Sequence, residues 1–72
     1  MTANEIARVQ SYLRRIFAND RIAISPPVQS GAPVEINIAG EFIGVLHRDE
    51  DEGEVSYDLN ISILEEDLPT VA

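Results

Sequence analysis

The chain has 72 residues, 13 acidic and 5 basic side chains, no cysteine and a net charge of −8 at pH 7. A chain of this length is expected to form one domain, 1–72, and the lack of cysteine excludes disulfides and cysteine-ligated zinc. The charge argues against nucleic acid and membranes as partners, because nucleic acids and anionic lipid surfaces attract clustered Lys and Arg.

A helix is predicted over residues 2–18, where the sequence opens with a capping signal. Thr2 and Glu5 have the spacing of a capping box, in which each side chain accepts a hydrogen bond from the backbone N–H of the other. Apolar residues follow with the 3.6-residue period of a helix: Ile6, Val9, Leu13, Ile16 and Phe17. This stripe predicts that one face of the helix packs on a sheet.

Four strands and a tail are predicted after the helix: 21–25, 34–38, 42–48, 55–63 and 64–72. The second and fourth strands alternate apolar and polar residues, which is typical of strands with one buried and one wet face. The third strand is apolar on both faces. Phe42 and Leu46 are expected to face the helix. Ile43 and Val45 are expected to face the other way, where they would also need cover.

Two turns set the register of the predicted sheet. If residues 48 and 55 face each other, Leu46 lies near Tyr57 on the helix side. At Gly40, a three-residue loop would keep the apolar residues of the second strand on the helix side, whereas a two-residue loop would turn them to the other face. We prefer the three-residue loop, because it gives one continuous core with the glycine in the left-handed conformation.

These elements predict an α+β fold, in which one N-terminal helix packs on an antiparallel meander of three or four strands. One helix can cover only one face of such a sheet. Ile43 and Val45, with Leu64 nearby, would then leave an apolar surface in water on the other face. A second copy of the chain could supply the missing core through a two-fold pairing of this face or of a sheet edge.

Residues 41–68 contain several distinctive features: a Phe-Ile-Gly-Val strand, the acidic turn with its glycine, then Ser-Tyr, Ile-Leu and Asp-Leu pairs. The segment reads EFIGVLHRDEDEGEVSYDLNISILEEDL. It resembles the C-terminal half of a family of short alphaproteobacterial proteins of unknown function. The N-terminal piece VQSYLRRIF is similar too, whereas SPPVQSGAP matches poorly. The resemblance implies a small helix-plus-sheet domain, and it transfers no activity, cofactor or catalytic residue.

The turn between the third and fourth strands is strongly acidic, with Asp49, Glu50, Asp51 and Glu52 in sequence. It does not match an EF-hand calcium loop, because glycine and asparagine stand at two positions where that loop needs acidic ligands. We interpret the run as a solvated hairpin turn. Two alternatives are a docking surface for a basic protein, in the extreme a mimic of nucleic acid, and a weak metal or small-ligand sensor.

No catalytic residue, cofactor or dedicated metal site is predicted. The chain has no cysteine or lysine nucleophile, one histidine and no glycine-rich phosphate loop. His47 is expected at a strand end, half exposed on the face of Ile43 and Val45. The protein is therefore not expected to be an enzyme.

We expect a non-enzymatic protein–protein interaction module that forms a small homodimer. The candidate interface consists of Ile43, Val45, His47 and Leu64, on the sheet face that the helix leaves open. The start of the chain has no signal-peptide pattern, and no apolar run is long enough to cross a membrane. We therefore expect a soluble, cytoplasmic protein.

Overall fold

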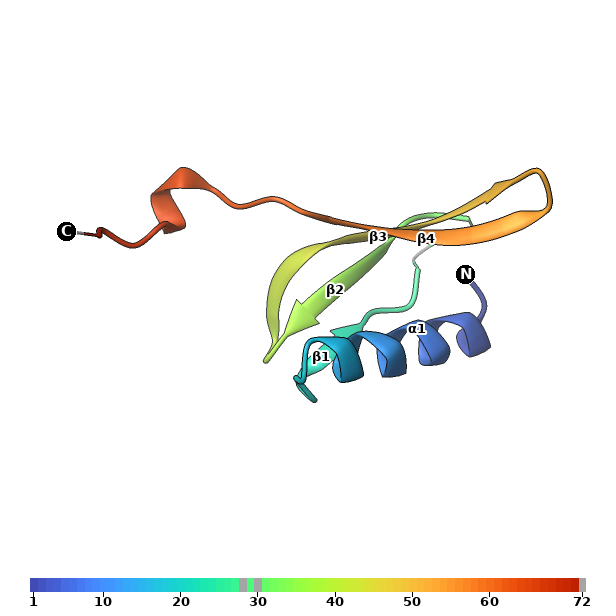
Figure 1. The fold of residues 1–72 in the computed structure, drawn as a ribbon, viewed down its shortest axis with the longest axis horizontal. Coiled ribbons are helices and arrows are strands. Elements are labelled where there is room, and N and C mark those ends of the chain that lie inside the picture. The colour runs from blue at the N-terminus through green and yellow to red at the C-terminus, as the bar shows by residue number, and fades with distance from the viewer. Residues whose placement is uncertain (28, 30, 72) are drawn as a thin grey trace.

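The fold consists of one helix, four strands and a short 3₁₀ turn. In order, these are α1 (Ala3–Ile16), β1 (Ile22–Ile24), β2 (Val34–Ile38), β3 (Glu41–Asp51), β4 (Glu54–Ile61) and η1 (Glu65–Asp67). The computed structural model describes residues 1–27, 29 and 31–71. The strands form one antiparallel sheet in the order β1-β2-β3-β4, and α1 lies along one of its faces (Figure 1). The prediction of an α+β fold with an N-terminal helix on an antiparallel meander is confirmed.

The helix begins where the capping signal predicts. Glu5 N–H donates to Thr2 Oγ1 at 3.1 Å, and Thr2 N–H donates to Glu5 Oε1 at 2.9 Å. These two bonds satisfy backbone donors that the first turn of a helix leaves free. The helix ends at Ile16, two residues before the predicted end, and the chain turns away through Ala18, whose φ of 51° is left-handed.

The turn between β2 and β3 contains two residues, so the prediction of a three-residue loop was wrong. Ile38 pairs with Glu41, and Ala39 and Gly40 between them have φ values of 53° and 83°. Positive φ at both central residues is the geometry of a type I′ turn, whose twist matches that of the flanking strands. A two-residue turn alone would put the apolar side chains of β2 on the face away from the helix.

A β-bulge in β3 returns the apolar side chains of β2 to the helix side of the sheet. Asn37 pairs with Phe42, but the next pair along the ladder is Ile36 with Gly44, so Ile43 has no partner in β2. One extra residue in a strand shifts the alternation by one position. The apolar residues of β2 therefore lie on the helix side, as predicted, although the turn that was expected to place them there is absent.

The same bulge rearranges the two faces of β3. Ile43 packs against the hydrophobic core, on the side of Leu46. Phe42 lies opposite Asn37 on the outer face and is 57% exposed. Val45 stays on the outer face and is half-buried. The predictions that Ile43 shares a face with Val45 and that Phe42 shares one with Leu46 were therefore wrong, because an unpaired residue shifts the alternation along the strand.

The hairpin of β3 and β4 is tighter than predicted. Arg48 lies opposite Tyr57, not opposite residue 55, because the turn contains only Glu52 and Gly53. Most of the acidic run therefore belongs to β3 rather than to the turn. A shift of two residues keeps each side chain on its face, so Tyr57 still lies on the helix side, as predicted. The observed β4 ends at Ile61, two residues earlier than predicted.

The core lies between α1 and the sheet. It consists of six buried apolar residues: Leu13, Ile22, Ile24, Val34, Ile36 and Leu46. Polar side chains of α1 also bond the outer edge of β1. Ile24 N–H donates to Gln10 Oε1 at 3.0 Å, and Arg14 Nε donates to Ile22 O at 2.8 Å. The helix thus occupies backbone groups that an edge strand would otherwise present to another chain.

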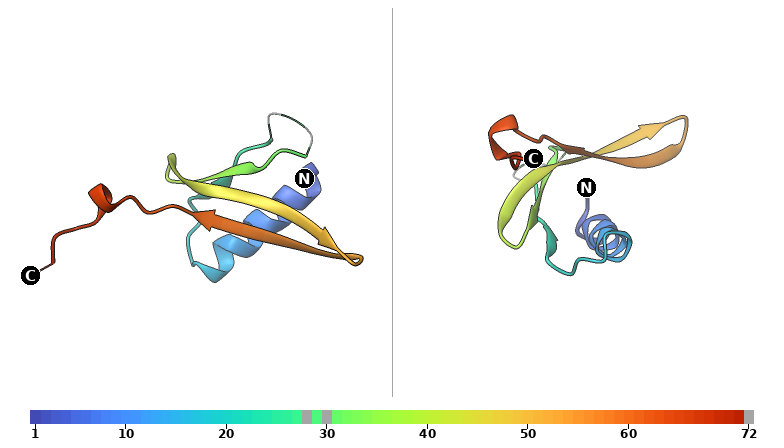
Figure 2. Two further views of the ribbon diagram at one scale, coloured as in Figure 1. Left: turned by 90° about the horizontal axis from the view of Figure 1, so that it is seen from above. Right: turned by 60° about the vertical axis from the view of Figure 1, so that its left-hand side comes forward.

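Beyond Ile61 the chain leaves the sheet and extends away from the rest of the protein (Figures 1 and 2). The molecule is elongated, with extents of 48 × 23 × 23 Å. We call residues 62–71 the arm. It contains η1 and is otherwise irregular, which fits the predicted lack of a period in the tail, and Ala72 lies outside the described residues. In the described ranges, no helix has the length and apolar character needed to cross a membrane.

Candidate functional site

The helix covers the sheet incompletely and leaves an apolar groove beside β4. One hollow of about 430 Å³ lies between α1 and the strands β3 and β4. It is lined by Glu5, Arg8, Val9, Tyr12, Leu13, Leu46, Tyr57 and Leu59. A second hollow of about 220 Å³ shares Leu13 and Leu59 with the first and continues to Phe17, Ile43 and Ile61. We call the two adjoining hollows the α1–β4 groove.

Several side chains around this groove are apolar and exposed. Tyr12 on α1, Phe17 directly after it and Ile61 at the end of β4 are each about half exposed although they line it. Their exposure follows from the position of α1, which is bonded to the edge of β1 on the far side of the sheet. Apolar side chains in such a cluster mark a surface that a partner can cover.

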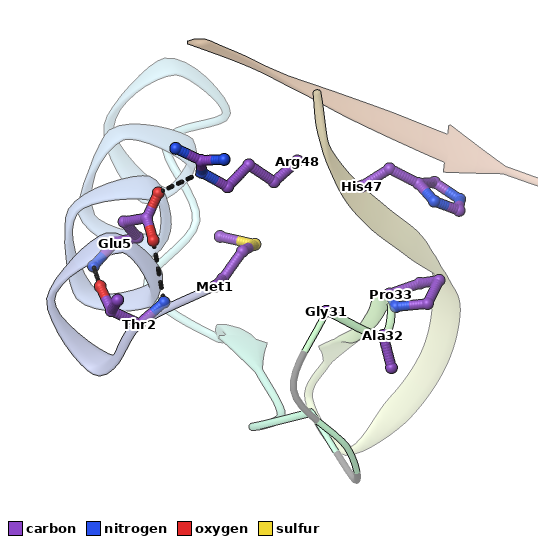
Figure 3. Close-up of a pocket in the computed structure, with 8 residues that line it drawn as sticks. All are labelled: Met1, Thr2, Glu5, Gly31, Ala32, Pro33, His47 and Arg48. Atoms are coloured by element: carbon purple, nitrogen blue, oxygen red, sulfur yellow. Dashed lines mark hydrogen bonds and ion pairs between the residues drawn. The ribbon is translucent and has the colours of Figure 1, made fainter. Parts of the chain in front are cut away.

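A polar network closes one end of the groove. Oε2 of Glu5 accepts a hydrogen bond from Tyr57 Oη at 2.6 Å and from Arg48 Nε at 2.8 Å (Figure 3 shows the Arg48 contact). Arg48 also contacts Glu50 Oε1 through Nη1 at 3.0 Å. The network connects the first turn of α1 to both strands of the hairpin, so it fixes the width of the groove at this end.

The network shifts the pKa values of its three side chains, Glu5, Arg48 and Tyr57. Hydrogen bonds from the Thr2 backbone, the Tyr57 hydroxyl and the Arg48 guanidinium, in decreasing order of effect, lower the pKa of Glu5 from 4.5 to about 2. The hydrogen bond to the Glu5 carboxylate, together with burial, raises the pKa of Tyr57. Glu5 also raises the pKa of Arg48. These shifts stabilise an ion pair, and they do not produce a group that titrates near neutral pH.

The four residues of the predicted interface are not brought together. Ile43 faces the helix and lines the groove, whereas Val45 lies on the outer face. His47 is exposed opposite Asp58, also on the outer face. Leu64 belongs to the arm, which departs from the sheet, and it is 54% exposed. The apolar surface left uncovered by the helix is thus the groove, on the opposite side of the sheet from the one predicted.

The acidic residues of the predicted docking turn lie at the far end of the hairpin. Asp49, Glu50 and Asp51 are the last residues of β3, Glu52 is in the turn, and all four are exposed. Glu52 and Gly53 both have positive φ, 51° and 81°, so this is a second two-residue turn of the I′ kind.

His47 and the acidic residues do not form a metal site in the part of the chain that the structure describes. No group of three or more His, Cys, Asp or Glu is close enough there to hold an ion. A hollow of about 480 Å³ next to the N-terminus is lined by both His47 and Glu5. In it the imidazole points away from Glu5 and Arg48 (Figure 3).

Sequence reasoning missed the groove and the network that closes it. The alternation of β4 places Tyr57 and Leu59 on the helix side, which was a usable signal. The position of α1 over that face was not readable, because it depends on the hydrogen bonds that Gln10 and Arg14 make to β1. Both residues resemble ordinary exposed polar positions of a helix.

The comparisons with known proteins identify a family. A family model described as a protein of unknown function (DUF3126) matches residues 5–67. The chain belongs to this family. The DUF3126 match includes Glu5 at its start and η1 at its end, so most of the arm is part of the family domain. No curated protein and no solved structure matches the chain.

Proposed function

We propose that this DUF3126 protein is a non-enzymatic protein–protein interaction module that works as a homodimer. The observation that carries the proposal is the α1–β4 groove beside the free edge of β4. β4 has eight residues and is an outermost strand of the sheet. An edge strand of this length next to uncovered apolar side chains is a favourable place for a second chain to pair.

A homodimer sets a minimum size for the interface. A specific interface buries about 800 Å² per partner, or at least about 500 Å² for a weak one. The chain exposes 5738 Å² in total. A second copy would therefore have to cover roughly an eleventh to a seventh of the surface, so the interface has to extend from the groove to the β4 edge and the residues around it. A two-fold arrangement would present the same patch from both copies.

The cysteine-free composition supports the cytoplasm as the site of this dimer, because a reducing compartment does not favour disulfides. The resemblance to short alphaproteobacterial proteins supports a bacterial source. Neither feature points to a cofactor, and the proposed role needs none.

Light scattering on the full chain at micromolar concentration tests the homodimer. We expect a dimer that Ile61→Asp separates into monomers, because Ile61 lines the groove. Phe42→Asp is the matched control, since Phe42 is also about half exposed but lies on the outer face. A monomeric wild type, or a dimer that only Phe42→Asp separates, would overturn the proposal.

Docking of a basic protein at the acidic end of the hairpin is a second candidate function. The observation in its favour is that this end projects past α1, so its carboxylates are accessible (Figure 1). Its test is binding of an oligolysine peptide at low and high salt. Neutralising Asp49, Asp51 and Glu52 should weaken binding more than neutralising three arm residues, Glu65, Glu66 and Asp67. Equal loss in the two variants, or binding that ignores salt, would exclude it.

A further inference from the structure

We propose that the arm of one copy docks into the α1–β4 groove of a second copy, with Ile63, Leu64 and Leu68 as its apolar contacts. This inference rests on the proposed homodimer and adds to it the segment that fills the groove. Four observations support it: the exposure of the arm, the apolar lining of the groove, the complementary charges of the two, and the direction in which β4 ends.

The arm is apolar but lies outside the domain. The exposed fractions of Ile63, Leu64 and Leu68 are 73%, 54% and 55%. Large apolar side chains are less favourable in water than in a buried position, so the arm would gain stability from a surface that covers it. The arm nevertheless has local structure. In η1, Asp67 N–H donates to Leu64 O and Leu68 N–H to Glu65 O, both at 3.0 Å. The two leucines are thereby set on either side of one short turn.

The groove offers a site that fits apolar side chains. Its two hollows, about 430 and 220 Å³, are lined mainly by aliphatic and aromatic residues. An apolar cavity binds apolar groups more readily than it binds water molecules. The dimensions are also compatible: the stretch of α1 from Arg8 to its end at Ile16 is about 12 Å long. With the turn of η1 kept, arm residues 62–68 can span about 19 Å, so they can cross the groove along the helix.

The arm is acidic, whereas the helix rim of the groove carries arginines; Glu5, the carboxylate that lines the groove, is already paired with Arg48. Between its leucines the arm carries three consecutive acidic residues, Glu65, Glu66 and Asp67. Arg8 lines the first hollow. Arg15 lines a hollow on another side of α1 but reaches the rim of the groove, where its guanidinium carbon lies 5.4 Å from the ring centroid of Tyr12. Neither arginine has an ion pair within residues 1–27, 29 and 31–71, where the ion pairs involve Arg48. An arm in the groove would bring its carboxylates to these two cations.

The direction of β4 favours docking in another copy over docking in the same copy. Ile61 is the last residue of β4 and lines one end of the groove, and the arm leaves from there pointing outward (Figure 2). A return into its own groove requires a sharp reversal directly after Ile61. Ser62 is the one turn-favouring residue next to Ile61, and no glycine, asparagine or proline follows before Pro69, so the sequence gives little support to a sharp reversal there. Exchange between two copies needs no reversal and fills both grooves at once.

Cysteine cross-linking tests the inference directly, because the chain has no cysteine of its own. One chain carries Tyr12→Cys, a second, size-tagged chain carries Leu68→Cys, and the two are mixed and mildly oxidised. A disulfide between them can form only between copies, and only if the Cα atoms come within about 7 Å. Ser11→Cys replaces Tyr12→Cys in the control, since Ser11 is the exposed neighbour that lines a hollow on another side of α1.

We expect at least about tenfold more mixed disulfide with Tyr12→Cys than with Ser11→Cys, as the distance limit for a disulfide is strict. Equal yields from the two positions would overturn the inference. So would a disulfide that forms only when Tyr12→Cys and Leu68→Cys are in the same chain, because that result would place the arm in its own groove.

A second measurement separates failure of this inference from failure of the homodimer. Leu64→Asp with Leu68→Asp should raise the dimer dissociation constant at least about 100-fold, because each dimer loses four buried leucines. Thr70→Asp with Val71→Asp adds the same charge beyond the docking residues and should leave the constant within about threefold. A full-length dimer that withstands the leucine changes would refute arm docking alone, whereas a wild-type monomer would refute both proposals.

Discussion

The hydroxyl of Tyr57 donates a 2.6 Å hydrogen bond to Oε2 of Glu5, which joins the last strand to the first turn of the helix. The two residues are 52 positions apart. The same Glu5 carboxylate completes the capping box through its other oxygen, Oε1. One side chain therefore starts the helix and also holds it to the hairpin, so local and long-range order depend on each other at this point.

Tyr57→Phe should lower the melting temperature, because it leaves Glu5 with one long-range donor fewer while keeping the ring. The control is Tyr12→Phe, which changes an exposed tyrosine at the rim of the groove and should leave the melting temperature unchanged. Thermal unfolding followed by circular dichroism measures both. Equal shifts in the two variants would contradict the role given to the Tyr57 hydroxyl.

The contribution of Glu5 should depend on pH in the acidic range. Its pKa is lowered from 4.5 to about 2 in the folded state, so the folded state favours the carboxylate. The stabilisation is present above pH 4.5 and is lost as the pH falls toward 2, where the folded protein also takes up the proton. Glu5→Gln should therefore be less stable than wild type at pH 7, and the difference should shrink below pH 4.5.

Denaturant unfolding of wild type and Glu5→Gln at several pH values measures this effect. Glu41→Gln is the control, because Glu41 is exposed and forms no ion pair within the described residues. A Glu5→Gln difference that stays constant from pH 7 to pH 2.5 would contradict the linkage.

Ala39→Asn should stabilise the protein by about 0.5–1 kcal/mol. Ala39 has a φ of 53° in the turn before Gly40, and asparagine tolerates the left-handed conformation better than alanine does. The expected rise in melting temperature is roughly 2–8 °C for a domain of this size. Ala39→Val should act in the opposite direction, since a β-branched side chain is strained at positive φ. Stabilisation by valine would contradict the turn geometry.

Gly44→Ala should destabilise the protein by about 1–3 kcal/mol. A Cβ atom on Gly44 would collide with the backbone carbonyl oxygen of Asn60 on β4, so the two strands would have to separate. Ser56→Ala, an exposed change on the other strand of the same hairpin, should have an effect within about 0.5 kcal/mol. Chemical denaturation distinguishes the two, and a silent Gly44→Ala would contradict the close approach of β3 and β4.

Ile43→Asn and Phe42→Asn test the bulge, because they change neighbouring residues that it sends to opposite faces. Ile43 packs against the core, so Ile43→Asn should cost about 2–4 kcal/mol in free energy of unfolding. Phe42 is mostly exposed on the outer face, and Phe42→Asn should cost about 1 kcal/mol or less. A reversed order would indicate that β3 alternates regularly, as the sequence pattern alone predicts.

The bulge shows where sequence reasoning reached its limit. The helix start and the strand Val34–Ile38 follow from local signals, namely the capping box and a clean alternation. No local sequence pattern marks the unpaired Ile43. The bulge there is needed because a two-residue turn alone would put the apolar residues of β2 on the face away from the helix. The turn was also hard to recognise, since Ala-Gly is a weaker indicator of a type I′ turn than Asn-Gly.

The candidate site was not predicted. The sequence indicated an uncovered apolar surface on the face away from the helix, at Ile43 and Val45, whereas the groove lies on the helix side. The uncovered side could not be assigned, because the alternation of β3 changes at one residue and the helix is held to β1 by Gln10 and Arg14. The acidic end of the hairpin was visible in the sequence, and the structure extends β3 through most of it.

The hydrogen bonds from Gln10 and Arg14 to β1 also limit how far the sheet can grow. A sheet with two open borders can add copies at both and lengthen into a fibre. Here the helix bonds two outward-facing backbone groups of the short edge strand β1, Ile22 O and Ile24 N–H, whereas the edge of the long strand β4 is accessible. A sheet that can pair through one edge strand only stops growing once two copies have paired. The contacts that position α1 on β1 therefore also oppose polymerisation.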